Sequence, residues 1–397
     1  MSKKDILKQY QRYVMPTYDR FPLIITKGKG KYVWDTNNKR YLDFFPGWAV
    51  SVLGHCHPLV LRNVKKQLDR IIHVPNNYYN ILQGKLAEEI IKNSFEGKVF
   101  FANSGAEAVE AAIKLARRYG YPKRYQIISM RGSFHGRTLA AIALTGQPKY
   151  QEGFKPLPSG FRYVPFNNFD ALTKAITDKT VAIVIEPIQG EGGINVADKD
   201  YLKKVRRLCN KKDILLIFDE IQTGMGRTGK MFCFQHYQIT PDAMTLSKAL
   251  GGGFPIAALV AGKKVSNVLS PGTHATTFGG SPVVCAASLG VFEALKKERL
   301  IQNVNKISPY FFKRLDELKR RYYDIIKEVR GMGFMIGLEL TQPADAVYRF
   351  CLKEGLLINY TQRYVLRILP PLNINRKDVD RAISILDKAF QELKNEK

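Results

Sequence analysis

The sequence predicts an α/β protein with two parts, a large domain built on a mainly parallel sheet and a smaller α+β domain. Between about residues 55 and 290, short apolar runs alternate with amphipathic helical patterns. This alternation is typical of a mainly parallel sheet covered on both faces. In the last hundred residues, long charged amphipathic helices surround short apolar runs instead. We therefore expect a large domain over 55–290, a small domain over 291–397, and an N-terminal segment over 1–54 that joins the small domain.

Each expected element rests on its local pattern of apolar, polar and turn-forming residues. Near the N-terminus we expect a short helix over about 5–13, and then strands over 24–26, 32–35 and 41–44 with a Thr-Asn-Asn turn between the last two. In the large domain we expect helices over 107–119 and 201–209, and strands over 98–101, 126–130, 181–186, 214–219, 243–247 and 257–261. In the small domain we expect helices over about 291–322 and 377–395, and strands over 336–340 and 366–369.

The chain is strongly basic. Its 397 residues include 62 Lys and Arg against 35 Asp and Glu, a formal net charge of +27, which raises the question of nucleic-acid binding. The basic residues are spread along the chain, however, and recur beside apolar residues at helical spacing, as in 202–208 and 312–321. Such spacing is typical of the solvated faces of amphipathic helices. We therefore expect no nucleic-acid partner, although the same field could steer anionic metabolites towards a cleft.

The sequence also indicates a cytoplasmic protein. No run approaches the ~18 consecutive apolar residues of a membrane helix, and the first residues are polar, unlike a secretory signal. The five cysteines are odd in number, scattered and without a C-x-x-C pair. This pattern argues against a disulfide framework and a zinc ribbon. We expect no membrane partner and no metal site.

Two short motifs resemble ligand sites but lack the necessary context. Gly224–Gly229 fits G-x-G-x-x-G and, with Lys230, approaches a Walker A loop. Met231 stands where that loop needs Ser or Thr to hold magnesium, so a nucleotide is not expected. His55 and His57 have the side chains of metal ligands, but no second cluster at ligand spacing completes a tetrahedral site. We interpret the two histidines as part of a turn.

The strongest candidate for chemistry is Lys248, the single charged residue in the window Ala243–Gly262. A lone ammonium in apolar surroundings has a readily lowered pKa, which suits a lysine that forms a Schiff base. Taken alone, the pattern leaves open the alternative that Lys248 extends from a loop into solvent.

Two further signals lie upstream of this lysine. The apolar run 214–218 ends in Asp219, and a carboxylate at the carboxyl edge of a parallel sheet can keep a pyridine nitrogen protonated or can simply cap a turn. Asn103–Glu107 links a strand to an alanine-rich helix, whose N-terminus and serine hydroxyl could receive a phosphate. Ser104 and Glu107 also form a capping-box pattern, and the two functions are compatible.

Together these elements resemble the class III, pyridoxal-phosphate-dependent aminotransferases of fold type I, and within them the acetylornithine aminotransferase group. The resemblance covers nearly the whole chain, and its most specific stretches are Asn103–Glu107, Ser133–Thr138, Glu186–Gly193, Phe218–Gly229 and Ser247–Pro255. It implies a seven-stranded sheet in the large domain, pyridoxal 5'-phosphate as the cofactor, and a homodimer with shared active sites.

The resemblance also assigns roles at the cofactor. Lys248 would bind it as a Schiff base and then move the substrate proton, and Asp219 would pair with the pyridinium nitrogen. The other expected contacts are Gln222 beside the phenolic oxygen, Phe134 on the ring face, Ser104 and Gly105 at the phosphate, and Thr277, which would reach the phosphate of the other subunit's site. From the residues alone, Phe134 could equally be a packing residue.

The implied reaction is ping-pong transfer of the δ-amino group of N2-acetyl-L-ornithine to 2-oxoglutarate, a step of arginine biosynthesis. Two guanidinium sites would let one cavity accept both substrates. Arg137 resembles the distal carboxylate site used by both, and Arg367 the proximal site needed for glutamate alone. Glu191 would neutralise Arg367 when the ω-amine enters, and its flanking glycines would let it swing aside for glutamate. The alternative is that Glu191 and Arg367 form only a structural pair. Thr276 is also assigned to the substrate, with a turn residue as the alternative.

The sequence leaves the exact substrate open. The alternatives are ornithine, succinylornithine, N-succinyl-diaminopimelate and 4-aminobutyrate aminotransferases. Glutamate-1-semialdehyde aminomutase, an isomerase, has the same fold, and a basic nucleic-acid-binding protein represents a third class. The choice between an acetyl and a succinyl group on the substrate is not determined by the sequence.

Overall fold

The apolar runs in the middle of the chain come together in one sheet. The computed structural model describes residues 3–21 and 23–395. The strands of this sheet are β4 (Gly97–Ala102), β5 (Gln126–Met130), β6 (Phe161–Val164), β7 (Thr180–Ile185), β10 (Leu215–Asp219), β11 (Ala243–Leu246) and β12 (Ala257–Gly262). Their order is β4-β12-β11-β10-β7-β5-β6, and neighbours are parallel except that β12 is antiparallel to β4 and β11. The expected mainly parallel seven-stranded sheet is confirmed.

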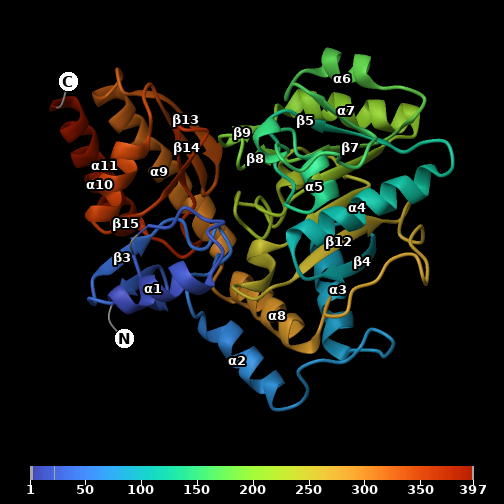
Figure 1. Ribbon diagram of the computed structural model, residues 1–397, viewed down its shortest axis with the longest axis horizontal. Helices are drawn as coiled ribbons and strands as arrows, with labels where there is room; N and C mark the ends of the chain where they lie inside the picture. The colour runs from blue at the N-terminus through green and yellow to red at the C-terminus, as the bar shows by residue number, and fades with distance from the viewer. Residues whose placement is uncertain (1–2, 22, 396–397) are drawn as a thin grey trace.

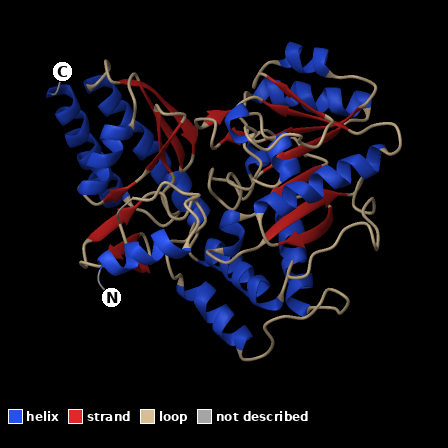
Figure 2. Ribbon diagram, in the orientation of Figure 1, coloured by secondary structure: helices blue, strands red, loops and turns tan. Residues whose placement is uncertain are grey.

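Helices cover both faces of this sheet because its strands are apolar on both sides. In β10, Ile217 points into one apolar core and Phe218 into the other, as the alternation of side chains along a strand requires. Helices α4 (Gly105–Gly120) and α5 (Leu139–Leu144) pack on the first face, and α7 (Lys199–Lys212) packs on the second (Figure 2). The carboxyl edge of the parallel strands is the edge of such a sheet that can carry a site.

The other half of the molecule combines the two ends of the chain, and both termini lie on it (Figure 1). One four-stranded sheet joins β1 (Ile25–Lys29), β2 (Tyr32–Asp35) and β3 (Arg40–Asp43) to β15 (Leu356–Leu357), which runs parallel to β3. The second, in the order β13-β14-β17-β16, contains β13 (Ile326–Met332), β14 (Met335–Leu340), β16 (Asn359–Thr361) and β17 (Val365–Ile368). Its helices are α1 (Lys3–Tyr13), α9 (Leu300–Arg321), α10 (Asp345–Lys353) and α11 (Arg376–Asn395).

The single helix expected over 291–322 is in fact two helices. Helix α8 (Pro282–Lys297) ends before Arg299, whose φ of +50° interrupts the helical backbone, and α9 follows it. The amphipathic pattern continues across this break, so the pattern alone does not reveal it. The expected domain boundary at 290/291 consequently falls inside α8, and the division into domains stays a prediction. Sequence reasoning also missed β6, β13 and β16, which are short or poor in apolar residues.

The remaining elements connect the two halves or lie at their edges. Helices α2 (Pro58–Leu68) and α3 (Ile81–Asn93) pack against α8. Small additions to the large half are α6 (Phe169–Ala175) and the hairpin of β8 (Ile188–Gln189) and β9 (Asn195–Val196). Over the described residues, no helix is both long enough and apolar enough to cross a bilayer.

Candidate active site

A cavity lies at the carboxyl edge of the large sheet. Its lining includes six of the residues singled out from the sequence: Gly105, Phe134, Glu191, Asp219, Gln222 and Lys248. These residues stand in segments that follow β4, β5, β7, β10 and β11, strands that all point the same way in the sheet. The parallel topology therefore explains why residues far apart in sequence meet here.

Lys248 occupies a constrained position at the start of a single 3₁₀ turn, Lys248–Gly251, directly after β11. Its φ of +43° is a left-handed conformation that side chains rarely adopt, and such backbone strain is found preferentially at functional sites. Burial lowers the pKa of its ammonium, and the positive charge of Arg367 lowers it further. The negative charges of Glu191 and Asp219 raise this pKa, but the net shift is downward. A lowered pKa favours the neutral amine that a nucleophile or a base requires.

Asp219 is a buried carboxylate held by three donors. Its Oδ1 accepts hydrogen bonds from the Thr245 hydroxyl at 3.1 Å and from the Ile221 backbone at 3.1 Å. Its Oδ2 lies 2.7 Å from Nδ1 of His135, whose ring is fully buried. Burial lowers the pKa of His135, but the hydrogen bond and charge of Asp219 and the charge of Glu186 outweigh it, so the pKa is raised overall. The histidine therefore fixes the orientation of the Asp219 carboxylate.

Gln222 has a buried side-chain amide without a partner. Neither its Oε1 nor its Nε2 has a hydrogen-bond partner among the described residues, although buried polar groups are usually satisfied. A Cβ added at Gly190 would stand 1.9 Å from Gln222 Oε1, so a larger residue at 190 would displace the Gln222 amide. An unpaired amide beside the cavity fits the phenolic oxygen of pyridoxal phosphate.

The N-terminus of α4 offers the complementary anion site. Ser104 is its N-cap, and its hydroxyl accepts a hydrogen bond from the Glu107 backbone at 3.3 Å. The capping box is only half formed, because the Glu107 carboxylate accepts from the backbone of Asn103 at 2.6 Å instead of from Ser104. The first N–H groups of the helix, including that of Gly105, have no intrahelical acceptor and can bind a phosphate.

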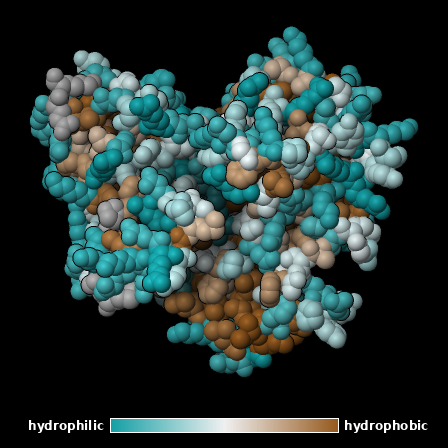
Figure 3. Space-filling model, in the orientation of Figure 1, coloured by the Kyte–Doolittle hydropathy of each residue, from teal (hydrophilic) through white to brown (hydrophobic). Residues whose placement is uncertain are grey.

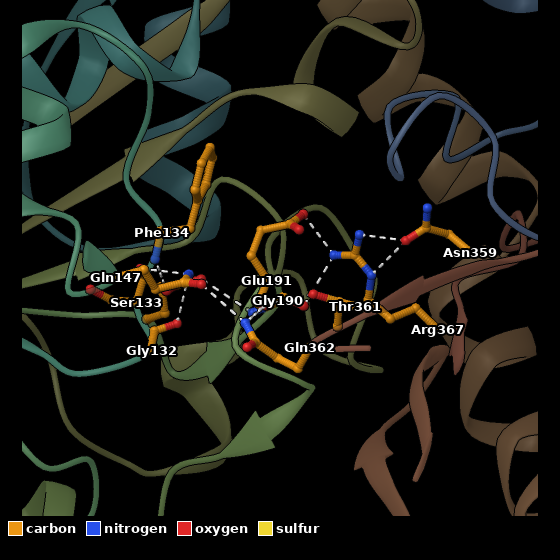
Figure 4. A network of polar contacts seen from close by, with 11 residues as sticks. Gly132, Ser133, Phe134, Gln147, Gly190, Glu191, Asn359, Thr361, Gln362 and Arg367 are labelled. Atoms are coloured by element: carbon orange, nitrogen blue, oxygen red, sulfur yellow. Dashed lines mark hydrogen bonds and ion pairs between the residues drawn. The ribbon is translucent and has the colours of Figure 1, made fainter. Parts of the chain in front are cut away.

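Arg367, on β17 in the other half of the molecule, is not itself part of the cavity lining but contacts two lining residues, Gly190 and Glu191. It is 1% exposed, and its Nη1 lies 2.6 Å from Glu191 Oε1 in a buried ion pair. Figure 4 shows the two side chains facing each other, with Asn359 on the far side of the guanidinium. Nη1 also donates to the Gly190 carbonyl at 3.1 Å. The predicted pairing of Glu191 with Arg367 is present in this geometry, although its role in substrate choice stays a prediction.

The backbone of the Glu191 loop is fixed. The Glu191 carbonyl accepts hydrogen bonds from the Thr361 hydroxyl and from Nε2 of Gln362, both at 2.7 Å. Nε2 of Gln362 also donates to Oε1 of Gln147 at 3.0 Å, which ties the loop to the segment before Phe134 (Figure 4). The glycines beside Glu191 permit close packing, since a Cβ at Gly192 would stand 2.5 Å from the Gly132 carbonyl. The expected movement of Glu191 stays a prediction.

Arg137 lies at the outer side of the site and is exposed. Its guanidinium carbon is 4.2 Å from the ring centre of Tyr150 and 5.6 Å from that of Phe134. Among the ion pairs of the described residues, none includes Arg137, so its charge is available to a carboxylate of a substrate.

Thr276 and Thr277 are not brought into this cavity. The Thr276 hydroxyl accepts a hydrogen bond from Nδ2 of Asn103 at 3.0 Å, and Thr277 is exposed. Their assignments therefore stay predictions that depend on a second copy of the chain.

The histidine pair His55 and His57 and the glycine-rich motif Gly224–Gly229 make structural contacts within the chain. His55 binds the Asp43 carboxylate at 2.8 Å, and His57 binds a different one, that of Glu298, at 3.0 Å. No group of three or more metal-ligating side chains occurs among the described residues. In the glycine-rich motif, the guanidinium of Arg227 is buried and donates to the carbonyls of Phe334 and Pro370.

Sequence reasoning missed three residues at this site. His135 and Glu186 both lie inside stretches that carry the family resemblance, so their motif positions were the available signal. The Glu186 carboxylate accepts from the backbones of Phe134 at 2.8 Å and Gly190 at 3.2 Å, and burial raises its pKa to about 7. Asn359 had no signal of its own.

The fold and this constellation define an enzyme that holds pyridoxal phosphate. Residues 13–390 match the class-III aminotransferase family. The acetylornithine aminotransferase of Methanocaldococcus jannaschii is 50% identical over 99% of this chain and 100% of its own. The ornithine aminotransferase of Toxoplasma gondii ME49 has a TM-score of 0.95 and 33% identity, and covers 100% of this chain and 97% of its own. Another structure of a T. gondii ornithine aminotransferase, with partial occupancy of PLP at its active site, has a TM-score of 0.94 and 33% identity, with 100% and 96% covered. The chain belongs to the class-III aminotransferases.

Proposed function

We propose that this enzyme transfers the δ-amino group of N2-acetyl-L-ornithine to 2-oxoglutarate, with pyridoxal phosphate as cofactor, in arginine biosynthesis. The observation that carries the proposal is the buried Arg367–Glu191 pair, a proximal cation that can be neutralised within the site. The relatives named acetylornithine aminotransferase, 43% to 50% identical over nearly the whole chain, support the substrate.

Pyridoxal phosphate, when bound, supplies an electron sink for the charge that develops when a substrate C–H bond breaks. The protein supplies the proton transfers. The Lys248 amine takes a proton from the substrate carbon and returns it, for which its lowered pKa is suited. Asp219, fixed by His135 and Thr245, holds a proton on the pyridine nitrogen. Phe134 would cover the ring face and help exclude water.

The two arginines explain how one cavity can serve two unlike substrates. Arg137 would hold the carboxylate far from the reacting amine in both. Glutamate also brings a carboxylate beside its reacting α-amine, and this group would replace Glu191 on Arg367. Acetylornithine brings only methylene groups to that place, so Glu191 would stay and keep Arg367 neutralised.

Ornithine is the second candidate substrate. The observation in its favour is the TM-score of 0.95 to an ornithine aminotransferase, since the same pair of arginines would serve a free ω-amine. A steady-state panel decides between them, with acetylornithine, succinylornithine, ornithine, succinyl-diaminopimelate and 4-aminobutyrate each tested against 2-oxoglutarate. We expect the highest kcat/KM for acetylornithine. A higher value for ornithine would overturn the assignment of the substrate.

A homodimer with shared active sites is part of the proposal. Five exposed apolar residues, which we call the α2–α3 patch, lie between α2 and α3 or at the first position of α3 (Ile71, Ile72, Tyr78, Tyr79 and Ile81). Figure 3 shows apolar side chains gathered over α2 and α8 at the bottom of the view. Asn76, within this segment, donates to the carbonyls of Thr276 and Gly279. A second copy covering the patch would therefore reach the loop that carries Thr277.

Light scattering tests this assembly. Tyr79 is fully exposed in one chain, so Tyr79→Glu should produce monomers that bind pyridoxal phosphate weakly. Tyr323→Glu, the same change at an exposed position outside the patch, is the matched control and should leave the dimer intact. A monomeric wild type with normal turnover would refute the shared site.

The five cysteines, all unpaired, support the proposed cytoplasmic location.

A further inference from the structure

Asn359 contacts the part of Arg367 that Glu191 does not. The two residues are direct partners across the antiparallel strands β16 and β17. The Asn359 Oδ1 accepts from Nη2 of Arg367 at 2.7 Å and from Nε at 3.1 Å. Both groups on the arginine are donors, so only the carbonyl oxygen of the amide can face them. One neutral atom thus occupies the whole Nε–Nη2 edge of the guanidinium (Figure 4).

The other contacts of Arg367 leave a single edge for exchange. Nη1 donates to the Gly190 carbonyl and to Glu191, and the guanidinium carbon lies 5.1 Å from the ring centre of Phe45 and 5.3 Å from that of Trp48. A guanidinium has five N–H donors, and these contacts use four of them. The fifth, on Nη2, lies at the Nη1–Nη2 end of the guanidinium, beside the nitrogen that Glu191 contacts. Only at that end can a substrate carboxylate accept two hydrogen bonds from the guanidinium at once.

The hydrogen-bond acceptors of Arg367 differ in their charge. Of the three acceptors around Arg367, only Glu191 carries a charge. Arg367 is therefore neutralised when Glu191 is in place and carries a full positive charge when Glu191 leaves. A second carboxylate at position 359 would remove this difference, because it would neutralise the guanidinium in both states.

We propose that Asn359 is a specificity-determining residue: its neutral oxygen orients Arg367 without neutralising it, and so makes glutamate binding possible at the site that also accepts the ω-amine. This inference rests on the proposed function for its second substrate. For glutamate and 2-oxoglutarate it rests only on the geometry of Arg367.

The first test is Asn359→Asp, which keeps the size of the side chain and adds a charge. The half-reaction with glutamate should lose about ten- to a hundredfold in kcat/KM, the worth of a hydrogen bond between charged groups. The half-reaction with acetylornithine should stay within about threefold of the wild type. Asn395→Asp, the same chemical change at an exposed position on α11, is the control and should change neither.

The second test combines two substitutions. Glu191→Ala alone should leave Arg367 charged and slow the acetylornithine half-reaction. Adding Asn359→Asp should restore that half-reaction, because the new carboxylate neutralises Arg367 from its other edge. Rescue of one substrate together with loss of the other is a result that a merely structural role of Asn359 does not produce.

Binding of glutarate, measured by calorimetry, gives a readout that does not depend on turnover. Asn359→Asp should weaken it by about tenfold or more, and Asn395→Asp should not. The proposal is overturned if the Asn359→Asp variant binds glutarate and glutamate as the wild type does, or if a folded variant loses both half-reactions equally. If the wild type does not use acetylornithine, the proposed function fails, and the glutamate and glutarate measurements still decide the role of Asn359.

Discussion

Removal of the Glu191 carboxylate should separate the two half-reactions of this enzyme. In Glu191→Ala, Arg367 keeps its contacts with Asn359 and the Gly190 carbonyl but loses the one anionic partner that it has among the described residues. When the ω-amine substrate enters, its methylene chain would lie against an uncompensated cation that is 1% exposed. Such a charge is costly because water cannot replace the missing partner. Glutamate brings its own carboxylate and avoids this cost.

The structure sets the size of the effect. The pair is short, 2.6 Å from Nη1 to Oε1, and the side chains are 1% and 14% exposed. A hydrogen bond between charged groups contributes about 1.5–3 kcal/mol, which corresponds to about ten- to 150-fold in an equilibrium or rate ratio. We therefore expect the acetylornithine half-reaction to slow by that factor. The glutamate half-reaction should be unchanged or faster, because glutamate no longer has to displace Glu191.

Stopped-flow absorbance of the cofactor, with each substrate alone, measures the two half-reactions separately. Glu191→Gln is the matched control: it keeps a hydrogen-bond acceptor without the charge and should retain only part of the discrimination. Arg137→Ala provides the contrast and should slow both half-reactions, since both substrates use that site. An equal loss in both half-reactions for Glu191→Ala would refute the reasoning and leave the pair a structural contact.

Three further outcomes follow from the site. Lys248→Ala should lose turnover and the visible absorbance of the covalently bound cofactor in a purified, folded enzyme, and normal turnover would contradict the assignment. Asp219→Asn should fold and bind pyridoxal phosphate but lose orders of magnitude in rate, because an amide carries no charge to hold the pyridine proton; near-normal rates would assign that task to another group. Burial raises the pKa of Glu186 from 4.5 to about 7. The contribution of this carboxyl group to the free energy of unfolding, about 3 kcal/mol, is therefore present below pH 4.5 and lost as the pH rises through 7. Glu186→Gln should therefore flatten the pH dependence of Tm in this window, and an unchanged slope would show that Glu186 does not titrate there.

That Asp219 and Lys248 line one cavity could be predicted because their sequence signals are local. Asp219 ends an apolar run, and Lys248 is the only charge in its window. Each pattern reports a buried position directly, and the parallel sheet then brings such strand ends together. The sheet was predictable for the same reason, since its central strands are apolar throughout. The edge strand β6 was not, because only one of its four residues is fully buried and its pattern is short.

Residues whose role depends on register could not be predicted. Asn359 reaches Arg367 only because β16 and β17 pair so that the two stand opposite each other. Strand β16 is three residues long and carries two polar residues, so the sequence gives no reason to expect a strand there. The break at Arg299 belongs to the same class, because a left-handed residue between two amphipathic helices leaves their common pattern intact.

The glycines around Glu191 can be interpreted in two ways, as a hinge or as positions of close packing. Their presence suggested a loop that could swing Glu191 aside. The structure gives them another function, since a Cβ at Gly190 would collide with Gln222 and one at Gly192 would stand 2.5 Å from the Gly132 carbonyl. With the Glu191 carbonyl bound by Thr361 and Gln362, we expect the proposed exchange of partners on Arg367 to occur by rotation of side-chain torsions. Such rotations are faster than domain movements, so the switch between substrates need not limit turnover.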